Sequence, residues 1–476
     1  MSIGKLYGKL IENVSIEGAG SEGLSIARVN GQVIFVKFGV PGDVVHIRLI
    51  AKKQKTLFAE IAEILTPSPN RITPFCSHFG ICGGCKWQQM NYETQLYWKN
   101  KQVIDAFERI GKIQCQEWLP IVGAPYQQTY RNKLEYAFSN KRWLLHDEQT
   151  DEGTQWNAAG FHIAGRFDKI LEINTCYLQD DLTNSIRHFI KNYALNHALS
   201  FYDIKAQTGF LRNVILRNTT LGQWMVILIV GEQNEEATSG IMKAIAENFP
   251  QITSLIYGVN TKVNDAIYDI DLFTYQGMEY IEEKLEDVTY RIRPKSFFQT
   301  NSLQALNLYK ITRDFAGLTG KELVYDLYCG TGSISLFIAR HASKVFGIES
   351  VAQAIMDAKE NAMNNGVENV EFTVGDMRYE LNDTFVKKTG KPDVVITDPP
   401  RAGMHPDVVS QLLNMEAQKI VYVSCNPATQ ARDLALLSEK YDVLKTCPVD
   451  MFPHTHHVEN VTLLWLKSKE TDDLNH

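Results

Sequence analysis

A cysteine in a polar loop and a glutamate in a histidine-rich loop are the residues of this sequence best suited to covalent chemistry. Cys425 follows an apolar, strand-like run and precedes Asn426 and Pro427, so its thiol belongs to a turn rather than to a core. Glu459 follows a segment that begins at Met451 and contains three histidines. A thiol can attack an electrophilic carbon, and a carboxylate can remove a proton afterwards. We therefore predict a nucleophile at Cys425 and a general base at Glu459.

Acidic residues end successive apolar runs in the C-terminal part of the chain, at the edge where parallel sheets bind ligands. Asp326 precedes a Gly-Thr-Gly turn, and Glu349 and Asp376 end the next two runs. Such carboxylates suit S-adenosylmethionine, which carries an amine, a ribose diol and a sulfonium but no phosphate. A dinucleotide-binding dehydrogenase is disfavoured, because Ser335 stands where the third glycine of its motif would be.

Residues in neighbouring loops disfavour two other kinds of site. The fourth run ends in a rigid loop that begins at Asp398, continues with two prolines and reaches Arg401. Amino-methyltransferases stack an aromatic ring on the target base at the position of Arg401, so an arginine there argues against that class. A metal site at His454, His456 and His457 is disfavoured, since no further ligands with metal spacing stand beside them.

A nucleophilic cysteine and a base together suit methylation of uracil at C5. That carbon is too weak a nucleophile to attack a methyl donor by itself. A thiolate that adds to C6 turns the ring into an enolate, and C5 of the enolate can attack. After transfer, a base must remove the proton from C5 so that the thiolate can leave. The pair Cys425 and Glu459 supplies both functions.

Four motifs, in this order and spacing, resemble those of the bacterial RNA uracil-C5 methyltransferase family. They are DLYCGTG at 326–332, DPPRAG at 398–403, SCNPAT at 424–429 and FPHTHHVE at 452–459. The resemblance is specific over residues 295–467 and looser but continuous elsewhere. It implies an S-adenosylmethionine-dependent enzyme in which Cys425 is the nucleophile and Glu459 the base.

The same resemblance implies a pocket for the cofactor and the target base. Its residues would be Gln299, Tyr328, Ser333, Glu349, Asp376 and Asp398, with Asp398 also among the catalytic residues. Family members often carry asparagine at the position of Ser333, which leaves that cofactor contact open. Phenylalanine is frequent at the position of Tyr328, a difference that should matter little.

Three cysteines lie close together in the sequence at Cys76, Cys82 and Cys85, with glycines between them. Cys176 is the best candidate for a fourth ligand. From the residues alone, zinc and a 4Fe–4S cluster are nearly level as occupants, whereas a disulfide is disfavoured without a secretory signal. The family resemblance implies 4Fe–4S, because one branch carries this spacing with a distant fourth cysteine. Cys115 and Cys447 lie outside the cluster, and no role is assigned to them.

The pattern of apolar runs predicts three domains and an α/β fold class. Short strands between glycine turns predict an OB-like barrel over residues 1–66, and the family resemblance implies that it is of the TRAM type. A mixed α+β middle domain over 67–291 carries the cysteine cluster. From 292 to 476, strands alternate with helical segments, which predicts a doubly wound, Rossmann-like methyltransferase domain.

Basic and aromatic residues outside the catalytic motifs point to RNA. Residues 1–66 hold eight Lys and Arg against six Asp and Glu, with three lysines gathered at residues 52–55. In the middle domain, residues 130–133 and 165–169 combine basic and aromatic side chains that can hold a backbone and stack bases. The target uracil must leave any stack to reach Cys425, so we expect base flipping.

Composition excludes several classes of protein. The chain has 476 residues, is 44% hydrophobic and 22% charged, and has no apolar run near the roughly 20 residues of a membrane span. The first residues contain no apolar signal core, so we expect a cytoplasmic protein that contacts no membrane. A net charge of −7 argues against binding to DNA and against strong non-specific binding to any duplex. We expect a monomer.

These observations favour a methyltransferase for uridine C5 in RNA. The barrel and the cysteine cluster favour 23S rRNA as substrate, since the tRNA branch of the family usually lacks both. A tRNA uridine C5-methyltransferase is one alternative. A non-catalytic RNA-binding assembly factor is another, but loss of Cys425 or Glu459 would be its signature, and both are present.

Overall fold

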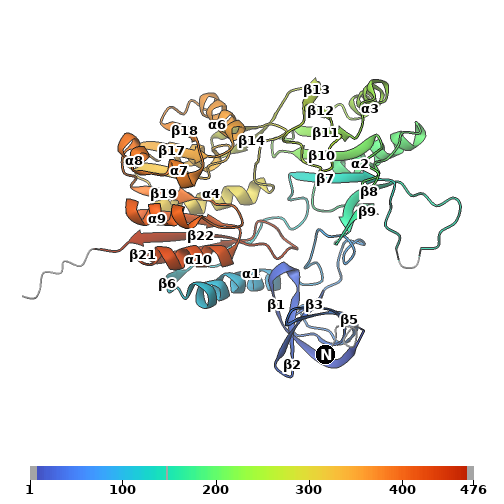
Figure 1. Ribbon diagram of the computed structural model, residues 1–476, viewed down its shortest axis with the longest axis horizontal. Helices are drawn as coiled ribbons and strands as arrows, with labels where there is room; N and C mark the ends of the chain where they lie inside the picture. The colour runs from blue at the N-terminus through green and yellow to red at the C-terminus, as the bar shows by residue number, and fades with distance from the viewer. Residues whose placement is uncertain (1–7, 146–147, 164, 469–476) are drawn as a thin grey trace, which may run out of the picture.

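The computed structural model describes residues 8–145, 148–163 and 165–468. The first five residues, on which the expectation of a cytoplasmic location rests, lie outside this range. The described residues form a closed barrel, a seven-stranded sheet, an eight-stranded sheet and a two-stranded hairpin. The two large sheets stand side by side, and the barrel lies below them beside helix α1 (Figure 1). No helix in the described part of the chain is long and apolar enough to cross a membrane.

The N-terminal barrel has the strand order β1-β2-β3-β5-β4. Its strands are β1 (Leu10–Ala19), β2 (Ser25–Val29), β3 (Gln32–Lys37), β4 (Val44–Lys53) and β5 (Thr56–Thr66), with a single turn of 3-10 helix at Ser21–Gly23. Alternate residues point inward, so that Val14, Ile16, Val45 and Ile47 lie fully or almost fully buried. Closure removes the unpaired edges that a small sheet would otherwise expose. The predicted barrel is confirmed.

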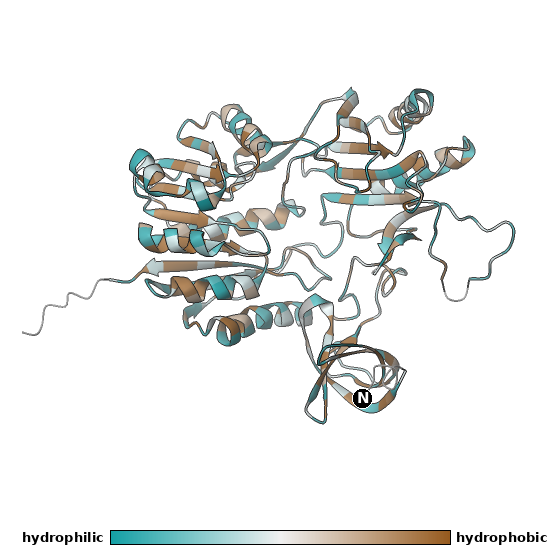
Figure 2. Cartoon of the chain, viewed as in Figure 1, coloured by the Kyte–Doolittle hydropathy of each residue, from teal (hydrophilic) through white to brown (hydrophobic). Residues whose placement is uncertain are grey.

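The middle sheet has the order β13-β12-β11-β10-β7-β8-β9. Its strands are β7 (Lys133–Ser139), β8 (Ala158–Ile163), β9 (Arg166–Glu172), β10 (Leu211–Asn218), β11 (Trp224–Val230), β12 (Ser254–Val259) and β13 (Leu272–Gly277). Helices α2 (Asp181–Asn196) and α3 (Glu235–Asn248) pack on one face through apolar residues such as Ile186, Ile190 and Ile241. Hydrophobic residues concentrate along the strands of this sheet (Figure 2). The hairpin that follows comprises β14 (Ile281–Leu285) and β15 (Val288–Ile292).

The C-terminal sheet has the order β18-β17-β16-β19-β20-β22-β21-β6. Its strands are β6 (Cys115–Trp118), β16 (Leu323–Leu327), β17 (Lys344–Glu349), β18 (Val370–Val374), β19 (Val394–Thr397), β20 (Lys419–Ser424), β21 (Tyr441–Val449) and β22 (Glu459–Leu466). The helices of this part are α4 (Ser302–Ala316), α5 (Ser333–Ala339), α6 (Ala352–Asn364), α7 (Met377–Glu380), α8 (Asp383–Thr389), α9 (Pro406–Met415) and α10 (Pro427–Leu437). The strands from β18 to β20 are parallel, and β22 enters antiparallel. The doubly wound α/β prediction is confirmed.

An N-terminal segment completes this C-terminal sheet. Helix α1 (Tyr92–Ala106) continues into a short π-helical turn at Phe107–Gly111, and the chain then forms β6. β6 pairs in parallel with β21, with Cys115 opposite Val443. Val103 and Phe107 pack in the same apolar cluster as Leu434 of α10. The segment between the barrel and the middle sheet is therefore part of the catalytic layer.

Candidate active site

Cys425 and Glu459 lie at the same end of a strand pair. β20 and β22 are antiparallel neighbours, with Ser424 directly opposite Asn460. Cys425 follows Ser424 directly, and Glu459, the first residue of β22, precedes Asn460. The charge on Glu459 raises the pKa of the Cys425 thiol, as expected for two groups that lie near each other.

Burial sets the proton affinities of these groups. Glu459 is only 6% exposed, and burial together with the neighbouring Asp398 raises its pKa to about 8. Burial, and then the nearby Asp326, likewise raises the pKa of Asp398 to about 7. The pKa of Cys425 rises to about 11 because of burial and of the charges on Glu459 and Asp398. Before substrate binds, Cys425 is therefore a neutral thiol, while the two carboxyls titrate near neutral pH.

Arg401 opposes these shifts, because its guanidinium lowers the pKa of both Cys425 and Glu459. Its backbone carbonyl accepts hydrogen bonds from Asn426 Nδ2 (3.0 Å) and Thr429 Oγ1 (3.2 Å), which connect the loop of Arg401 to the loop that carries Cys425. Arg401→Gln should raise both pKa values. We expect the pH dependence of Cys425 alkylation by iodoacetamide to move to higher pH by roughly one unit. Arg401→Lys, which keeps the charge, is the matched control, and an unchanged profile in Arg401→Gln would contradict this role.

The turn after β16 leaves room for a ligand. Gly332 has φ +74°, and a Cβ there would meet Phe372 at 2.8 Å, so this position needs glycine. Gly330 has φ +54°, and no heavy atom lies within 4 Å of where its Cβ would be. Asp326 Oδ2 accepts a hydrogen bond from Ser335 (2.5 Å), whereas its buried Oδ1 has no partner in the described structure. An open glycine beside an unpartnered buried carboxyl oxygen fits the cationic end of S-adenosylmethionine.

Two of the predicted cofactor residues surround the same turn. Glu349, at the end of β17, accepts a hydrogen bond from the backbone N–H of Gly330 (3.2 Å) through one carboxyl oxygen. Tyr328 has a left-handed backbone, with φ +62°, directly before the turn. Burial, and then Asp376, raises the pKa of Tyr328 to about 12, which places Asp376 close to its ring. The ends of three neighbouring parallel strands, β16, β17 and β18, thus lie at this edge of the sheet.

Three other predicted residues already have partners. Asp376 caps α7 and is ion-paired with Arg378 (2.6 Å), which lowers its pKa to about 2. The hydroxyl of Ser333 accepts a hydrogen bond from Tyr309 (3.1 Å). The backbone carbonyl of Gln299 accepts one from Asn132 Nδ2 of the middle domain (2.9 Å), an interaction that leaves its side chain free.

A buried ion pair that the sequence did not predict lies beneath residues 450–458, the loop that leads to Glu459 and is called the catalytic loop below. Lys99 of α1 and Asp450 are both fully buried, and their charged atoms lie 2.5 Å apart. Lys99 also donates to the carbonyl of Phe452 (2.9 Å), and Tyr92 donates to Asp450 (2.8 Å). Gln95, one turn before Lys99 on the same face, donates to His454 across the same contact. In the sequence, the indication of this contact is the pair of polar residues Gln95 and Lys99, which lie one helical turn apart on α1.

Removal of one member of this pair should be costly. Lys99→Met leaves the Asp450 carboxylate buried without its cation, which costs about 3–5 kcal/mol of the free energy of unfolding. We expect the double variant Lys99→Met/Asp450→Leu to regain part of that loss, because no charge is then left buried. Urea unfolding of the single and double variants measures both effects. A single variant as stable as the parent would show that the pair contributes nothing.

The catalytic loop also contacts the segment that follows Cys85. The carbonyl of His454 accepts hydrogen bonds from the backbone N–H groups of Lys86 (2.7 Å) and Trp87 (3.0 Å). Burial lowers the pKa of His454, His456 and His457 to about 4, 3 and 4, so these rings are neutral. Within residues 8–145, 148–163 and 165–468, no group of three His, Cys, Asp or Glu side chains is arranged to hold a metal ion.

The four predicted cluster ligands line one cavity of about 390 Å³. They are Cys76, Cys82, Cys85 and Cys176. Burial raises the pKa of Cys82 to about 11 and that of Cys85 to about 12, and the neighbouring thiols raise both further. The four side chains therefore line one cavity. Four cysteine thiolates are the usual donor set of an iron–sulfur cluster, although in the described residues these side chains are not arranged as a group that holds a metal ion.

The eight-stranded sheet and its carboxyl edge define a methyltransferase of the S-adenosylmethionine-dependent class. A family model described as tRNA (Uracil-5-)-methyltransferase matches residues 272–468, and one described as the TRAM domain of tRNA (uracil(54)-C(5))-methyltransferase matches residues 13–70. An uncharacterized RNA methyltransferase of Bacteroides thetaiotaomicron is 53% identical over 452 residues, which are 94% of this chain and 100% of that protein. One of Porphyromonas gingivalis is 48% identical, over 95% and 99% of the two chains.

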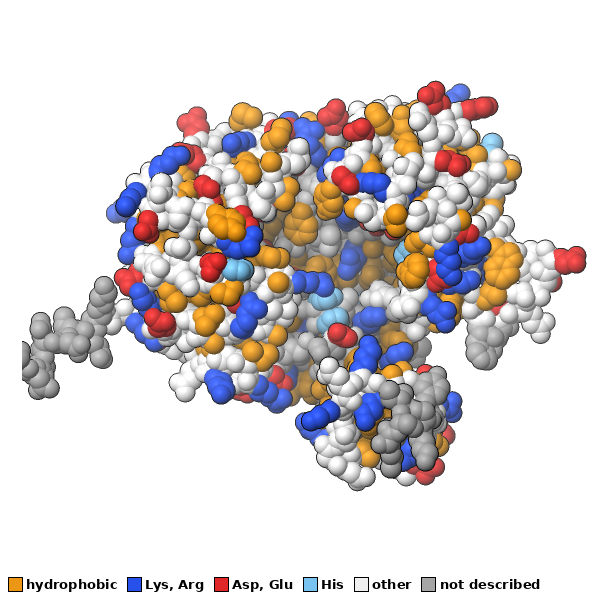
Figure 3. All heavy atoms as spheres, viewed as in Figure 1, with side chains coloured by type: hydrophobic (Ala, Val, Ile, Leu, Met, Phe, Trp, Pro, Cys, Tyr) orange, Lys and Arg blue, Asp and Glu red, His pale blue; other side chains and the backbone are white. Residues whose placement is uncertain are grey.

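A solved structure extends the likeness to the whole architecture. The Pyrococcus abyssi tRNA (uracil-54, C5)-methyltransferase, in complex with S-adenosyl-L-homocysteine, is 30% identical with a TM-score of 0.73. The match covers 94% of this chain and 99% of that one. The chain belongs to the RNA uracil-5-methyltransferase family, and the resemblance seen in its sequence is confirmed. The space-filling view shows the molecule hollowed between its two large lobes (Figure 3).

Proposed function

We propose that Cys425 and Glu459 carry the methylation of uridine C5. The observation that supports this assignment is the pairing of β20 with β22, in which Ser424 lies opposite Asn460 and Cys425 and Glu459 are the adjacent residues at the same end. The thiol of Cys425 loses its proton to solvent, its sulfur adds to C6 of the flipped uracil, and the displaced ring electrons move to C5, which takes the methyl group. Glu459 then removes the C5 proton, and the sulfur–C6 bond breaks. Asp398, when protonated, donates a hydrogen bond to the ring oxygen that gains charge.

We propose the cofactor site at the turn between β16 and α5. S-adenosylmethionine, when bound, supplies an electrophilic methyl group. Asp326 and the open Gly330 receive its amine end, and Glu349 binds the ribose diol. Asp376 reaches the adenine only if it exchanges its ion pair with Arg378. The remaining proposed contacts are Gln299, Tyr328, Ser333 and Asp398.

We propose that Cys76, Cys82, Cys85 and Cys176 hold a 4Fe–4S cluster, with zinc as the alternative. The common cavity and the mutual effects of the thiols on their pKa values support this. Anaerobic purification should give a brown protein with iron and sulfide in equal amounts, and Cys176→Ser should lose both. A colourless protein that contains zinc would overturn the assignment. Cys115→Ser, outside the cavity, is the control.

We propose 23S rRNA as the substrate of a monomeric, cytoplasmic enzyme, and the cysteine cluster supports this choice. The barrel no longer does, because its matching family model is that of a tRNA enzyme. tRNA is therefore a second candidate, favoured by the similarity to the Pyrococcus abyssi enzyme.

Transfer of tritiated methyl groups to unmodified transcripts distinguishes the two substrates. We expect label in 23S rRNA, recovered as 5-methyluridine at one or a few positions, and background in tRNA. Label confined to tRNA would overturn the choice of rRNA. The Cys425→Ala protein sets the background for both transcripts.

A further inference from the structure

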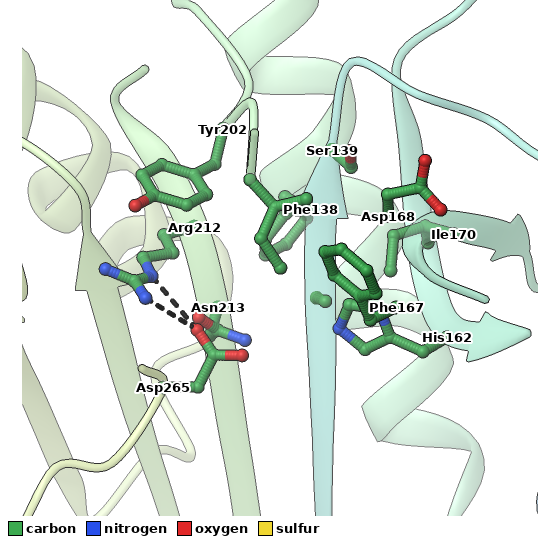
Figure 4. A pocket seen from close by; sticks show the side chains of 12 residues that line it. Phe138, Ser139, His162, Phe167, Asp168, Ile170, Tyr202, Arg212, Asn213 and Asp265 are labelled. Carbon is green, nitrogen blue, oxygen red and sulfur yellow. Dashed lines mark hydrogen bonds and ion pairs between the residues drawn. The ribbon is translucent and has the colours of Figure 1, made fainter. Parts of the chain in front are cut away.

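We infer that a hollow on the middle sheet binds an unpaired nucleobase that carries an exocyclic amino group. The inference rests on RNA as the substrate and concerns a surface of the middle sheet outside the proposed catalytic pocket. The hollow lies at the end of β7, lined by residues of β7, β8, β9 and β10 and by Asp265 (Figure 4). Phe167 and His162 lie on one side of it, Tyr202 and Arg212 on the other, and Asn213 between them.

Three polar atoms in this wall lack hydrogen-bond partners in the described structure. They are Tyr202 Oη, Asn213 Oδ1 and His162 Nδ1, all buried. Tyr202 is only 4% exposed and Asn213 only 5%. A buried polar atom without a partner has lost its hydrogen bonds to water and destabilises the fold until a ligand or water replaces them. Three such atoms around one hollow indicate a polar ligand.

The charged groups of the hollow are already neutralised. Arg212 is ion-paired with Asp265 (2.8 Å) and donates to the backbone carbonyls of Asn260 and Lys262. Asp168 is ion-paired with Lys205 (2.6 Å). A phosphate would find no free cation here, because the unpartnered groups are a hydroxyl, an amide and an imidazole. These groups suit a neutral ligand with hydrogen-bonding edges.

Phe167 supplies the stacking surface. Its side chain is among the most exposed aromatic groups of the chain, at 68%. Aromatic side chains that stand exposed beside polar groups are the usual platforms for unstacked RNA bases. The enclosed part of the hollow measures about 20 Å³, room for one exocyclic group rather than for a whole ring. A base on Phe167 would therefore insert only its edge.

The unpartnered oxygen of Asn213 selects the edge. It accepts a hydrogen bond, so it requires an N–H donor. The exocyclic amino groups of adenine, cytosine and guanine supply one, whereas the exocyclic groups of uracil are oxygens and its N3–H lies on the ring, which the hollow is too small to admit. Asparagine pairs with adenine through two hydrogen bonds, which makes adenine the best fit. The hollow would thus add sequence information that the catalytic site, which reads uracil, cannot supply.

The position of the hollow suits a neighbour of the methylated uridine. β7 begins after Asn132, whose backbone N–H donates to Thr300 (2.9 Å) beside Gln299 of the proposed catalytic pocket. From Asn132 to Ala137, at the floor of the hollow, the strand spans five residues, or about 17 Å. This equals about five stacked nucleotides, or fewer in an extended strand. One RNA segment could occupy both sites.

Binding of labelled 12-nucleotide oligo(A), oligo(C) and oligo(U), measured by fluorescence anisotropy without cofactor, tests this inference. We expect oligo(A) or oligo(C) to bind more tightly than oligo(U). Phe167→Ala and Asn213→Leu should each weaken that tighter binding about tenfold and leave oligo(U) little changed. Phe273→Ala, an exposed aromatic residue on the opposite edge strand β13, should bind all three like the parent.

Equal binding of the three oligomers, or Phe167→Ala binding like the parent, would overturn the inference and leave a hydrated hollow. Phe167 is exposed, so its variant should fold even if Asn213→Leu does not, and thermal unfolding checks both. The measurement needs neither Cys425 nor methyl transfer. A failure of the proposed catalytic mechanism would therefore leave the base preference intact, and the two failures are distinguishable.

Discussion

Cys425→Ala should form no covalent complex with RNA that carries 5-fluorouridine at the target position. In the parent protein the sulfur adds to C6 and C5 is methylated, but fluorine cannot leave as a proton does, so the complex persists through denaturation. Loss of the sulfur removes the bond itself, and methyl transfer to normal RNA should fall by at least about 10⁴-fold. Denaturing gel electrophoresis detects the complex as a shifted band.

Two controls make this result specific. Cys115→Ala removes a half-buried thiol that lies on β6, at the far edge of the sheet, and should leave the shifted band unchanged. Cys425→Ser keeps a hydroxyl in the same place but should behave like alanine, because a hydroxyl is the weaker nucleophile. A shifted band in folded Cys425→Ala would eliminate the covalent mechanism.

Glu459→Gln should trap the complex on normal RNA. The amide cannot take the C5 proton, so the sulfur stays bound after the methyl group has been transferred. We expect a shifted band without fluorouridine and product release slowed by roughly 10³-fold or more. In the parent, release should accelerate as pH rises towards about 8, because only the ionised Glu459 is a base. Normal turnover by Glu459→Gln would assign the base to another residue.

The same substitution has a consequence for stability. The folded-state pKa of Glu459, about 8, lies above the ordinary 4.5 because of burial and Asp398. A carboxyl of this kind favours folding while protonated, so its contribution is complete below pH 4.5 and is lost as pH rises through about 8. Glu459→Gln should therefore be more stable than the parent at pH 9 and show a smaller difference at pH 6. Thermal unfolding at the two pH values measures this.

Residue types and local spacing were enough to predict the fold, and they also supplied the candidate reacting groups. The strand Trp224–Val230 is wholly apolar, which makes it recognisable from the sequence alone. Acids at strand ends made the carboxyl edge of the sheet the candidate cofactor site, because parallel strands share that edge. The pairing of β20 with β22, which brings Cys425 and Glu459 to the same end of the sheet, could not be predicted, since it depends on the path of α10 and β21 between them.

Contacts between distant segments could not be predicted from local sequence patterns. Lys99 and Asp450 are 351 residues apart, and nothing near either residue indicates its partner. β6 has four residues, Cys115–Trp118, none of them fully buried, so it lacks the apolar alternation of a predictable strand. The unpartnered atoms of Tyr202 and Asn213 are likewise visible only after the sheet has assembled.

The edge position of β6 changes how the chain order of this enzyme is understood. The catalytic layer begins with α1 and β6, is interrupted by the middle sheet, and resumes at β16. In topological terms the middle sheet is an insertion within the catalytic layer and not a domain that precedes it. β6 must wait for β21, more than 300 residues later in synthesis, before it finds its neighbour. The pairing of β6 with β21 is therefore possible only after almost the whole chain has been synthesised.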